Sequence, residues 1–216
     1  MGKRLWKAFK ITLGIVLALV LVVAGLLGFW AHRLLHPPDV TAARAKWPRA
    51  MTHEAADRAA LDLVAKMTLD EKVAQMTGPG IAAFVVPPVF RSGEVAPVHA
   101  GRNDRLGIPA IAFSDGPRGI ICGRSTAFPV AMARAATWDL ELQRRVGDAI
   151  GEEARAQGAN YWGGLCLNLV RHPSMGRAEE VYGEDPWLTG EMGVAILEAV
   201  QRHNVMACAK HLALNS

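Results

Sequence analysis

The sequence predicts an α/β fold built of parallel βα units and preceded by one transmembrane helix. From about residue 54 onward, short apolar runs alternate with amphipathic helical segments. The apolar runs carry little polarity on either face, which is typical of strands covered by helices. The 216 residues are 51% hydrophobic and only 20% charged, and this composition excludes a disordered or low-complexity protein.

The positive charge of the chain is confined to its N-terminal arm. Residues 1–50 hold eight Lys or Arg and one acid, for a net charge of 8 − 1 = +7. Residues 51–216 hold sixteen Lys or Arg and nineteen acids, for a net charge of 16 − 19 = −3. Because a nucleic-acid-binding domain carries its basic charge on the folded part, we expect no nucleic-acid partner.

The arm contains a run of twenty uncharged residues at 11–30. A helix of that length spans the hydrocarbon core of a bilayer, roughly 30 Å thick. We therefore expect a basic cytoplasmic segment at 1–10, a transmembrane anchor at 11–30 and a stalk at 31–53, with 54–216 outside the cytoplasm, in the periplasm or at the cell surface. A cleaved signal peptide is the alternative, although the run is long for one and no A-x-A-like cleavage site follows it.

The first elements after the arm are marked by local signals. Thr68 and Glu71 form a capping box that predicts the start of a helix. The Gly- and Pro-rich segment 78–105 predicts a long loop. An apolar run over 109–114 predicts a strand that ends in a turn at Asp115.

The remaining elements alternate regularly between helix and strand. They are a helix over about 138–157 ended by Gly158, a strand over 161–170, a helix that begins after Asp185, and a strand over 205–209. About three βα units result, which argues for a parallel sheet. No glycine-rich nucleotide-binding motif is present in the sequence, so a nucleotide-binding sheet is disfavoured.

Four polar residues follow the predicted strands: Asp115, Arg177 (further out in its loop), Lys210 and His211. Because parallel βα units bring the carboxyl ends of their strands to one rim, we expect these side chains to converge. A carboxylate accepts hydrogen bonds from adjacent hydroxyls, a guanidinium offers a planar fork, and Lys and His donate to oxygen. Such a set suits a polyol.

Simpler interpretations of these residues stay open. Asp115 precedes a glycine and could be only a turn residue. Arg177 could pair with Glu180 or Glu184 in its own loop. The spacing of His203, Cys208 and His211 fits no common metal site, so we expect no metal.

The three cysteines, Cys122, Cys166 and Cys208, are widely spaced and odd in number. No CxxC or Cys/His finger pattern accompanies them, so neither a zinc module nor a disulfide framework is predicted. All three lie in or beside apolar runs, and we expect buried, unreactive thiols.

Five segments carry a resemblance to a known family. They are MTLDEKVAQM (67–76), FSDGPRG (113–119), FPVAMARAATWD (128–139), NLVRHPSMGRAEEVYGEDPWLTGEM (168–192) and ACAKHLALNS (207–216). In this order they resemble the N-terminal domain of glycoside hydrolase family 3, in its β-glucosidase-like branch. The resemblance implies a (β/α)8 barrel or a variant of it, so that 54–216 would be the N-terminal part of a (β/α)8 TIM-type barrel.

The resemblance also implies roles for the four polar residues. Asp115, Arg177, Lys210 and His211 match positions that hold a non-reducing-end sugar in the −1 subsite. Asp115 would take the two hydroxyls far from the scissile bond, and Lys210 and Arg177 would bind neighbouring hydroxyls. The family often has aromatic residues where Met175 and Leu212 stand.

The expected function is hydrolysis of terminal β-glycosides by a retaining mechanism, which needs two carboxylates. By the resemblance, the nucleophile and the acid–base lie beyond Ser216 in a longer protein, so no catalytic residue and no cofactor is assigned. A β-xylosidase or other exo-β-glycosidase of the same family is one alternative. A catalytically inactive, membrane-tethered carbohydrate-binding fragment is the other.

Overall fold

The computed structural model describes residues 2–35, 51–78, 95–213 and 215. The chain divides into two compact units, 1–38 and 39–216, and each is treated by itself. The predicted stalk at 31–53 lies largely outside the described residues.

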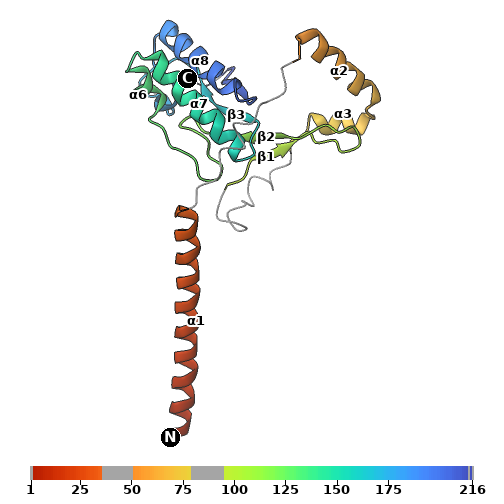
Figure 1. Ribbon diagram of the computed structural model, residues 1–216. Coiled ribbons are helices and arrows are strands. Elements are labelled where there is room, and N and C mark those ends of the chain that lie inside the picture. Colours follow the sequence, from red (N-terminus) through yellow and green to blue (C-terminus); the bar gives the residue numbers. More distant parts are fainter. Residues whose placement is uncertain (1, 36–50, 79–94, 214, 216) are drawn as a thin grey trace. The chain divides into compact units, whose positions relative to one another are not determined.

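The first unit is one long helix, α1 (Gly2–Leu35), shown in red to orange in Figure 1. Its segment Thr12–Phe29 has the length and composition of a membrane span, and none of that segment is buried within the protein. Lys10 places its ammonium 5.3 Å from the centroid of the Trp6 ring. The predicted basic segment and the predicted anchor are thus parts of one continuous helix. A signal sequence would meet the same criteria of length and composition, so membrane insertion stays a prediction.

The second unit contains a four-stranded sheet in the order β1-β2-β3-β4. Its strands are β1 (Val98–Ala100), β2 (Ile111–Ser114), β3 (Tyr161–Cys166) and β4 (Met206–Lys210). β2, β3 and β4 are parallel, which confirms the three predicted strands and their direction. β3 ends at Cys166, four residues before its predicted end.

β1 corrects the prediction of a loop over 78–105. This strand pairs antiparallel with β2, placing Val98 opposite Phe113, so the sheet is not wholly parallel. In the connection between the two strands, Asn103 and Ile108 form an antiparallel bridge with two backbone hydrogen bonds of 3.0 and 2.9 Å. A strand of three residues is too short to show an alternating pattern of apolar and polar side chains. β1 forms because it pairs with β2, and the sequence of 98–100 alone does not predict that pairing.

The crossover helices are α7 (Leu140–Ala156) and α8 (Pro186–Gln201), as predicted. Asp139 caps α7 by accepting a hydrogen bond from the Leu142 amide, and Asp185 caps α8 by accepting from the Trp187 and Leu188 amides. A short helix, α6 (Ala131–Ala135), and a 3-10 turn, η2 (Ala178–Glu180), complete this part of the chain.

The core forms where α7 and α8 pack side by side (Figure 1). A Cβ atom at Gly147 would lie 2.6 Å from the Cβ of Ala199, so only glycine permits this close approach of the two helices. The apolar face of α8 is fully buried in this core, together with Ile150 of α7 and with Trp162 and Leu165 of β3. The face consists of Met192, Ile196 and Val200.

Two helices precede the sheet, α2 (His53–Lys66) and α3 (Leu69–Gln75). The predicted capping box is confirmed: Thr68 Oγ1 accepts from the Glu71 amide at 3.2 Å, and the Glu71 carboxylate accepts from the Thr68 amide at 2.9 Å. Arg105, at the tip of the β1–β2 hairpin, donates its Nε to the Glu71 carboxylate at 2.7 Å. Hydrogen bonding to Arg105 lowers the pKa of Glu71 to about 2, so this residue links α3 to the hairpin as a carboxylate.

Candidate functional site

The carboxyl edge of the parallel strands gathers the predicted polar residues. Asp115 follows the last residue of β2, Lys210 is the last residue of β4, and His211 comes next. Asn168 lies two residues after β3. Since the three strands are parallel, these side chains belong to the same edge of the sheet.

Asp115 and Lys210 form an ion pair across this edge. Lys210 Nζ lies 2.8 Å from Asp115 Oδ1, which also accepts a hydrogen bond from the Gly116 amide at 2.9 Å. The side chain of Lys210 is 16% exposed and that of Asp115 is 41% exposed, so solvent reaches the carboxylate from one side. Asp115 is therefore a turn residue, and it also lies with Lys210 at the carboxyl edge, so the two interpretations of Asp115 do not exclude each other.

A buried tryptophan holds the turn that carries Asp115. Trp162 of β3 is fully buried and donates its indole N–H to the Gly116 carbonyl at 2.9 Å. Gly116 has a φ of +128°. A Cβ atom at Gly164 would lie 2.1 Å from the Gly116 carbonyl oxygen. Glycines at both positions allow the turn to lie directly on β3, which fixes where the Asp115 side chain begins.

Arg177 contacts both its own loop and the site. Its Nε donates to Glu180 Oε1 at 2.9 Å, and its second terminal nitrogen pairs with Glu180 Oε2. This pairing raises the pKa of Arg177 and lowers the pKa of Glu180, so both groups are charged. The remaining terminal nitrogen, Nη1, lies 3.1 Å from His211 Nε2. Glu180 is thus the local partner, and it presents Arg177 to the site.

His211 is enclosed by Asn168 and Arg177. Asn168 Oδ1 lies 2.8 Å from the His211 amide nitrogen and 3.1 Å from His211 Nδ1, and Asn168 Nδ2 donates to the His211 carbonyl at 3.0 Å. Burial lowers the pKa of His211, and the nearby charges of Arg177 and Lys210 lower it further. The imidazole is therefore neutral at pH 7. The peptide bond between Lys210 and His211 is cis.

The chemistry available at this edge is hydrogen bonding to a ligand with several oxygens. A carboxylate, an ammonium, a guanidinium and a neutral imidazole lie together there. The two acids of the site each pair with a cation, Asp115 with Lys210 and Glu180 with Arg177. Among the described residues, no group of three or more His, Cys, Asp or Glu side chains could hold a metal ion.

The cysteines play no part in this chemistry. Burial raises the pKa of Cys166, next to Glu180, to about 11, so the group is a thiol and not a reactive thiolate. Cys122 is buried as predicted, and its pKa is raised for the same reason. Cys208 is partly exposed, which corrects the prediction that all three are buried; its strand, β4, lies at an edge of the sheet.

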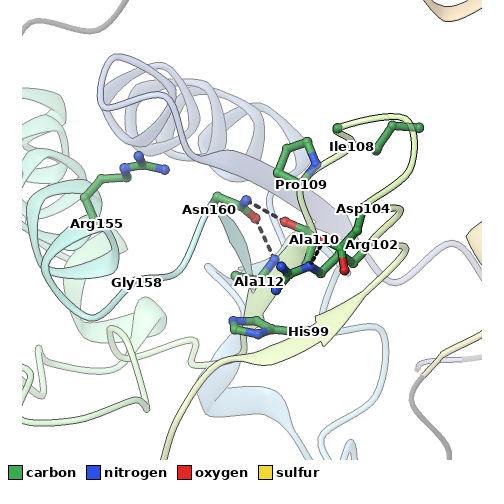
Figure 2. Close-up of a pocket in the computed structure, with 11 residues that line it drawn as sticks. His99, Arg102, Asp104, Ile108, Pro109, Ala110, Ala112, Arg155, Gly158 and Asn160 are labelled. Atoms are coloured by element: carbon green, nitrogen blue, oxygen red, sulfur yellow. Dashed lines mark hydrogen bonds and ion pairs between the residues drawn. The ribbon is translucent and has the colours of Figure 1, made fainter. Parts of the chain in front are cut away.

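A separate cavity of about 550 Å³ lies at the opposite, amino edge of the strands. Figure 2 shows His99, Arg102, Asp104, Arg155 and Asn160 around it. The Asn160 side chain accepts from the Ala112 amide at 2.7 Å and donates to the Ala110 carbonyl at 3.0 Å, so it braces β2 from this side. None of the four predicted site residues lines this cavity.

Sequence reasoning missed two residues that position the site, Trp162 and Asn168. It named Glu180 as one of two possible partners of Arg177, and the structure shows the pairing with Glu180. Trp162 stands in a run that looks uniformly apolar, which predicts burial and no specific partner. Asn168 offers a usable signal, because it is a polar residue near the end of the apolar run 161–170 and just before the loop of Arg177.

Fold and site together define a TIM-barrel-like α/β protein with charged and polar side chains at the carboxyl edge of its parallel strands. Residues 89–215 match the family model of the glycosyl hydrolase family 3 N terminal domain. The chain belongs to this family, which confirms the resemblance drawn from the sequence motifs.

Named relatives agree with this assignment. Thermostable beta-glucosidase B of Acetivibrio thermocellus is 34% identical over 167 residues, covering 71% of this chain and 20% of the relative. A beta-xylosidase of Formosa agariphila is 33% identical over 177 residues, covering 76% of this chain and 22% of the relative. The chain thus spans about a fifth of the length of the curated relatives it matches.

Solved structures agree on the fold. Beta-glucosidase 3B of Thermotoga neapolitana, in complex with glucose, superposes with a TM-score of 0.64 at 34% sequence identity. The match covers 72% of this chain and 23% of that one. DesR, a beta-glucosidase of Streptomyces venezuelae in complex with D-glucose, gives a TM-score of 0.62 at 31% identity, covering 72% of this chain and 19% of the other.

Proposed function

We propose that this chain carries the sugar-binding part of a retaining exo-β-glycosidase that acts on terminal β-glucosides. The observation that supports it most is the pair of contacts Lys210–Asp115 and Arg177–His211 at the carboxyl edge of three parallel strands. Relatives named beta-glucosidases, and a neighbour structure in complex with glucose, support the choice of sugar. We further propose that the four strands are the first part of a (β/α)8-type barrel.

Each site residue has a role that its chemistry supports. Asp115 accepts hydrogen bonds from two adjacent hydroxyls through its carboxylate. Lys210 and Arg177 donate to neighbouring hydroxyl oxygens, and His211 lies beside them. A hydrogen bond to a charged group contributes about 1.5–3 kcal/mol, so a few such bonds account for selective binding of one sugar unit.

The bond-breaking step needs two further carboxylates, about 5–5.5 Å apart in a retaining enzyme. The acids at this edge are held by cations and serve in binding. We assign no nucleophile and no acid–base to the described residues, and propose that the full-length protein supplies both from outside residues 1–216.

A β-xylosidase is the second candidate, and the relative from Formosa agariphila favours it. Xylose lacks the hydroxymethyl group of glucose, so the two activities differ in one substituent of the same sugar ring. The third possibility, a membrane-tethered binding protein without catalysis, is separated from both by assay.

Hydrolysis of 4-nitrophenyl β-glycosides by the full-length protein tests these proposals. We expect release of nitrophenol from the β-glucoside at a higher kcat/KM than from the β-xyloside, with the β-configuration retained in the first-formed sugar. A preference for the xyloside would select the second candidate. Saturable glucose binding without hydrolysis of any substrate would select the third.

We also propose that α1 anchors the protein in a membrane, with the basic N-terminus in the cytoplasm and the second unit outside it. The exposed apolar stretch Thr12–Phe29 and the lysines and arginines that precede it support this topology.

A further inference from the structure

The hydrogen-bonding polarity of His211 follows from groups around it whose own polarity is fixed. A backbone N–H only donates and a backbone carbonyl only accepts. Asn168 faces both of these on His211, with its oxygen 2.8 Å from the N–H and its nitrogen 3.0 Å from the carbonyl. The orientation of the Asn168 amide is thereby determined.

The position of the ring proton follows from this orientation. Asn168 Oδ1, an acceptor, lies 3.1 Å from His211 Nδ1, so Nδ1 has to carry a hydrogen. On the other side of the ring, Nη1 of Arg177 lies 3.1 Å from Nε2. A guanidinium only donates, so Nε2 has to offer its lone pair. Two independent neighbours thus select the same tautomer.

One contact opposes this assignment and is outweighed. Asn215 Nδ2 lies 2.8 Å from His211 Nδ1 and 3.1 Å from Asn168 Oδ1. With a proton on Nδ1, Asn215 donates only to the Asn168 oxygen. The opposite tautomer would satisfy Asn215 and leave two mismatches, an acceptor facing Asn168 Oδ1 and a donor facing Arg177. A doubly protonated ring would place a third positive charge beside Arg177 and Lys210.

We propose that Asn168 is a positioning residue that fixes His211 as the neutral tautomer protonated at Nδ1, so that Nε2 enters the site as a hydrogen-bond acceptor. This reverses the donor role expected from the sequence. Glu180 engages the other two nitrogens of Arg177, which leaves Nη1 as the group aimed at His211. The single lone pair of Nε2 accepts from Arg177 in the sugar-free site, so a ligand hydroxyl that replaces Arg177 at Nε2 has to donate its hydrogen.

The consequence for sugar binding rests on the proposed function, whereas the tautomer itself does not. Lys210 and Arg177 can only donate to the ligand, and Asp115 can only accept. When a ligand hydroxyl replaces Arg177 at Nε2, His211 adds a second, neutral acceptor beside the two cations. The site should therefore bind a sugar that places a hydroxyl at Nε2 more tightly than the analogue that places a fluorine there, because fluorine cannot donate a hydrogen bond.

The test is the ring-nitrogen spectrum of His211 in the chain with ¹⁵N-labelled histidine, held in detergent micelles without sugar. Long-range ¹H–¹⁵N correlation distinguishes protonated from unprotonated ring nitrogens, and the spectrum of His211→Gln identifies which of the seven histidines is His211. We expect a protonated Nδ1 and an unprotonated Nε2 at pH 7. The opposite pattern, or rapid exchange between the two tautomers, would overturn the proposal.

Asn168→Ala then tests the positioning role. We expect this variant to show a mixture of tautomers, because Nδ1 has lost its acceptor. The matched control is Asn160→Ala, which removes a similar bracing amide at the opposite edge and should leave the His211 spectrum unchanged. An unchanged His211 spectrum in Asn168→Ala would overturn the role of Asn168, and the wild-type spectrum decides the tautomer even if the variant fails to fold.

Glucose titration separates this proposal from the proposed function. If both hold, Asn168→Ala in the full-length protein weakens glucose binding roughly three- to tenfold, the size of one hydrogen bond. A protein with the expected tautomer and no affinity for glucose would reject the sugar site and retain the assignment of the ring proton.

Discussion

The carboxylate of Asp115 holds its own turn and the ammonium of Lys210 at once. Its Oδ1 accepts from the Gly116 amide and from Lys210 Nζ, and the group is 41% exposed. A partly exposed ion pair contributes only about 0–1 kcal/mol to stability. The arrangement therefore keeps a charged acceptor and a charged donor side by side for a ligand, and adds little to the free energy of folding.

Asp115→Asn should separate the two roles. The amide keeps an oxygen for the turn and loses the charge that faces sugar hydroxyls. We expect a folded, full-length protein whose kcat/KM on an aryl β-glucoside falls by about 10- to 100-fold, because one or more charge-assisted hydrogen bonds are lost. Asp104→Asn, at the opposite edge, is the matched control. Equal kinetics for the two variants would show that Asp115 serves the turn alone.

Trp162 is the second residue on which the site depends, because its indole N–H holds the Gly116 carbonyl. Trp162→Phe should lower the free energy of unfolding by about 1–3 kcal/mol, since the buried Gly116 carbonyl keeps only its hydrogen bond from the Gly119 amide and the smaller ring leaves space in the core. Trp187→Phe, at an exposed position, is the control. Denaturant unfolding followed by circular dichroism measures both variants. Equal stability of Trp162→Phe and the wild type would contradict the bracing role.

At the scale of elements, α3 is joined to the β1–β2 hairpin through a carboxylate. Glu71 caps its own helix and accepts hydrogen bonds from Arg105 of the hairpin. The pKa of Glu71 is about 2, below the ordinary 4.5. Because the folded-state value is the lower one, the stability that this link contributes is fully present above pH 4.5 and is lost as the pH falls toward 2.

Carboxyl-carbon NMR of Glu71 across this pH range checks the link. We expect titration near pH 2 in the wild type and a shift toward 4.5 in Arg105→Gln, which removes the main cause of the lowered pKa. Arg102→Gln, whose partner is Asp104, should leave the titration of Glu71 in place. A Glu71 that titrates near 4.5 in the wild type would refute the link.

The elements differ in how far the sequence could predict them. The capping box at Thr68 and the start of a helix after Asp185 depend on residues within one or two helical turns, and both predictions are correct. β1 depends on pairing with β2 and is too short for a pattern. The contacts of Trp162 with Gly116 and of Asn168 with His211 join residues 46 and 43 positions apart, so they exist only once the parallel sheet has formed.

The sequence could predict which residues gather at the site but not how they pair with one another. Parallel topology places Asp115, Lys210 and His211 at one edge, and topology follows from the order of strands and helices. The partners within the edge do not follow from it. The sequence left open whether Arg177 pairs locally or enters the site, and the geometry of Glu180 allows both.

At the scale of the whole molecule, the described sheet is open, with β1 and β4 at its edges. Met206 of β4 is partly exposed, and Leu212 just beyond it is fully exposed. The edge of the described sheet at β4 is therefore exposed, and the chain spans about a fifth of the length of the relatives it matches.

Anchoring by α1 is a prediction at this scale. Fractionation of cells that express the full-length protein should find it in the membrane fraction after an alkaline carbonate wash, with an intact N-terminus by protein sequencing. Replacement of residues 2–35 by a cleavable secretion signal should release the protein in active form. A mature N-terminus downstream of Trp30 in the natural protein would instead identify α1 as a signal sequence.

The most direct test of the central claim is a crystal structure of the full-length protein with glucose. We predict a glucose ring at the carboxyl edge of the strands, with its hydroxyl groups within hydrogen-bonding distance of Asp115, Lys210 and Arg177. Glucose bound only in the cavity between His99 and Asn160, at the opposite edge, would contradict the assignment of the site, as would saturating glucose with no sugar at either edge.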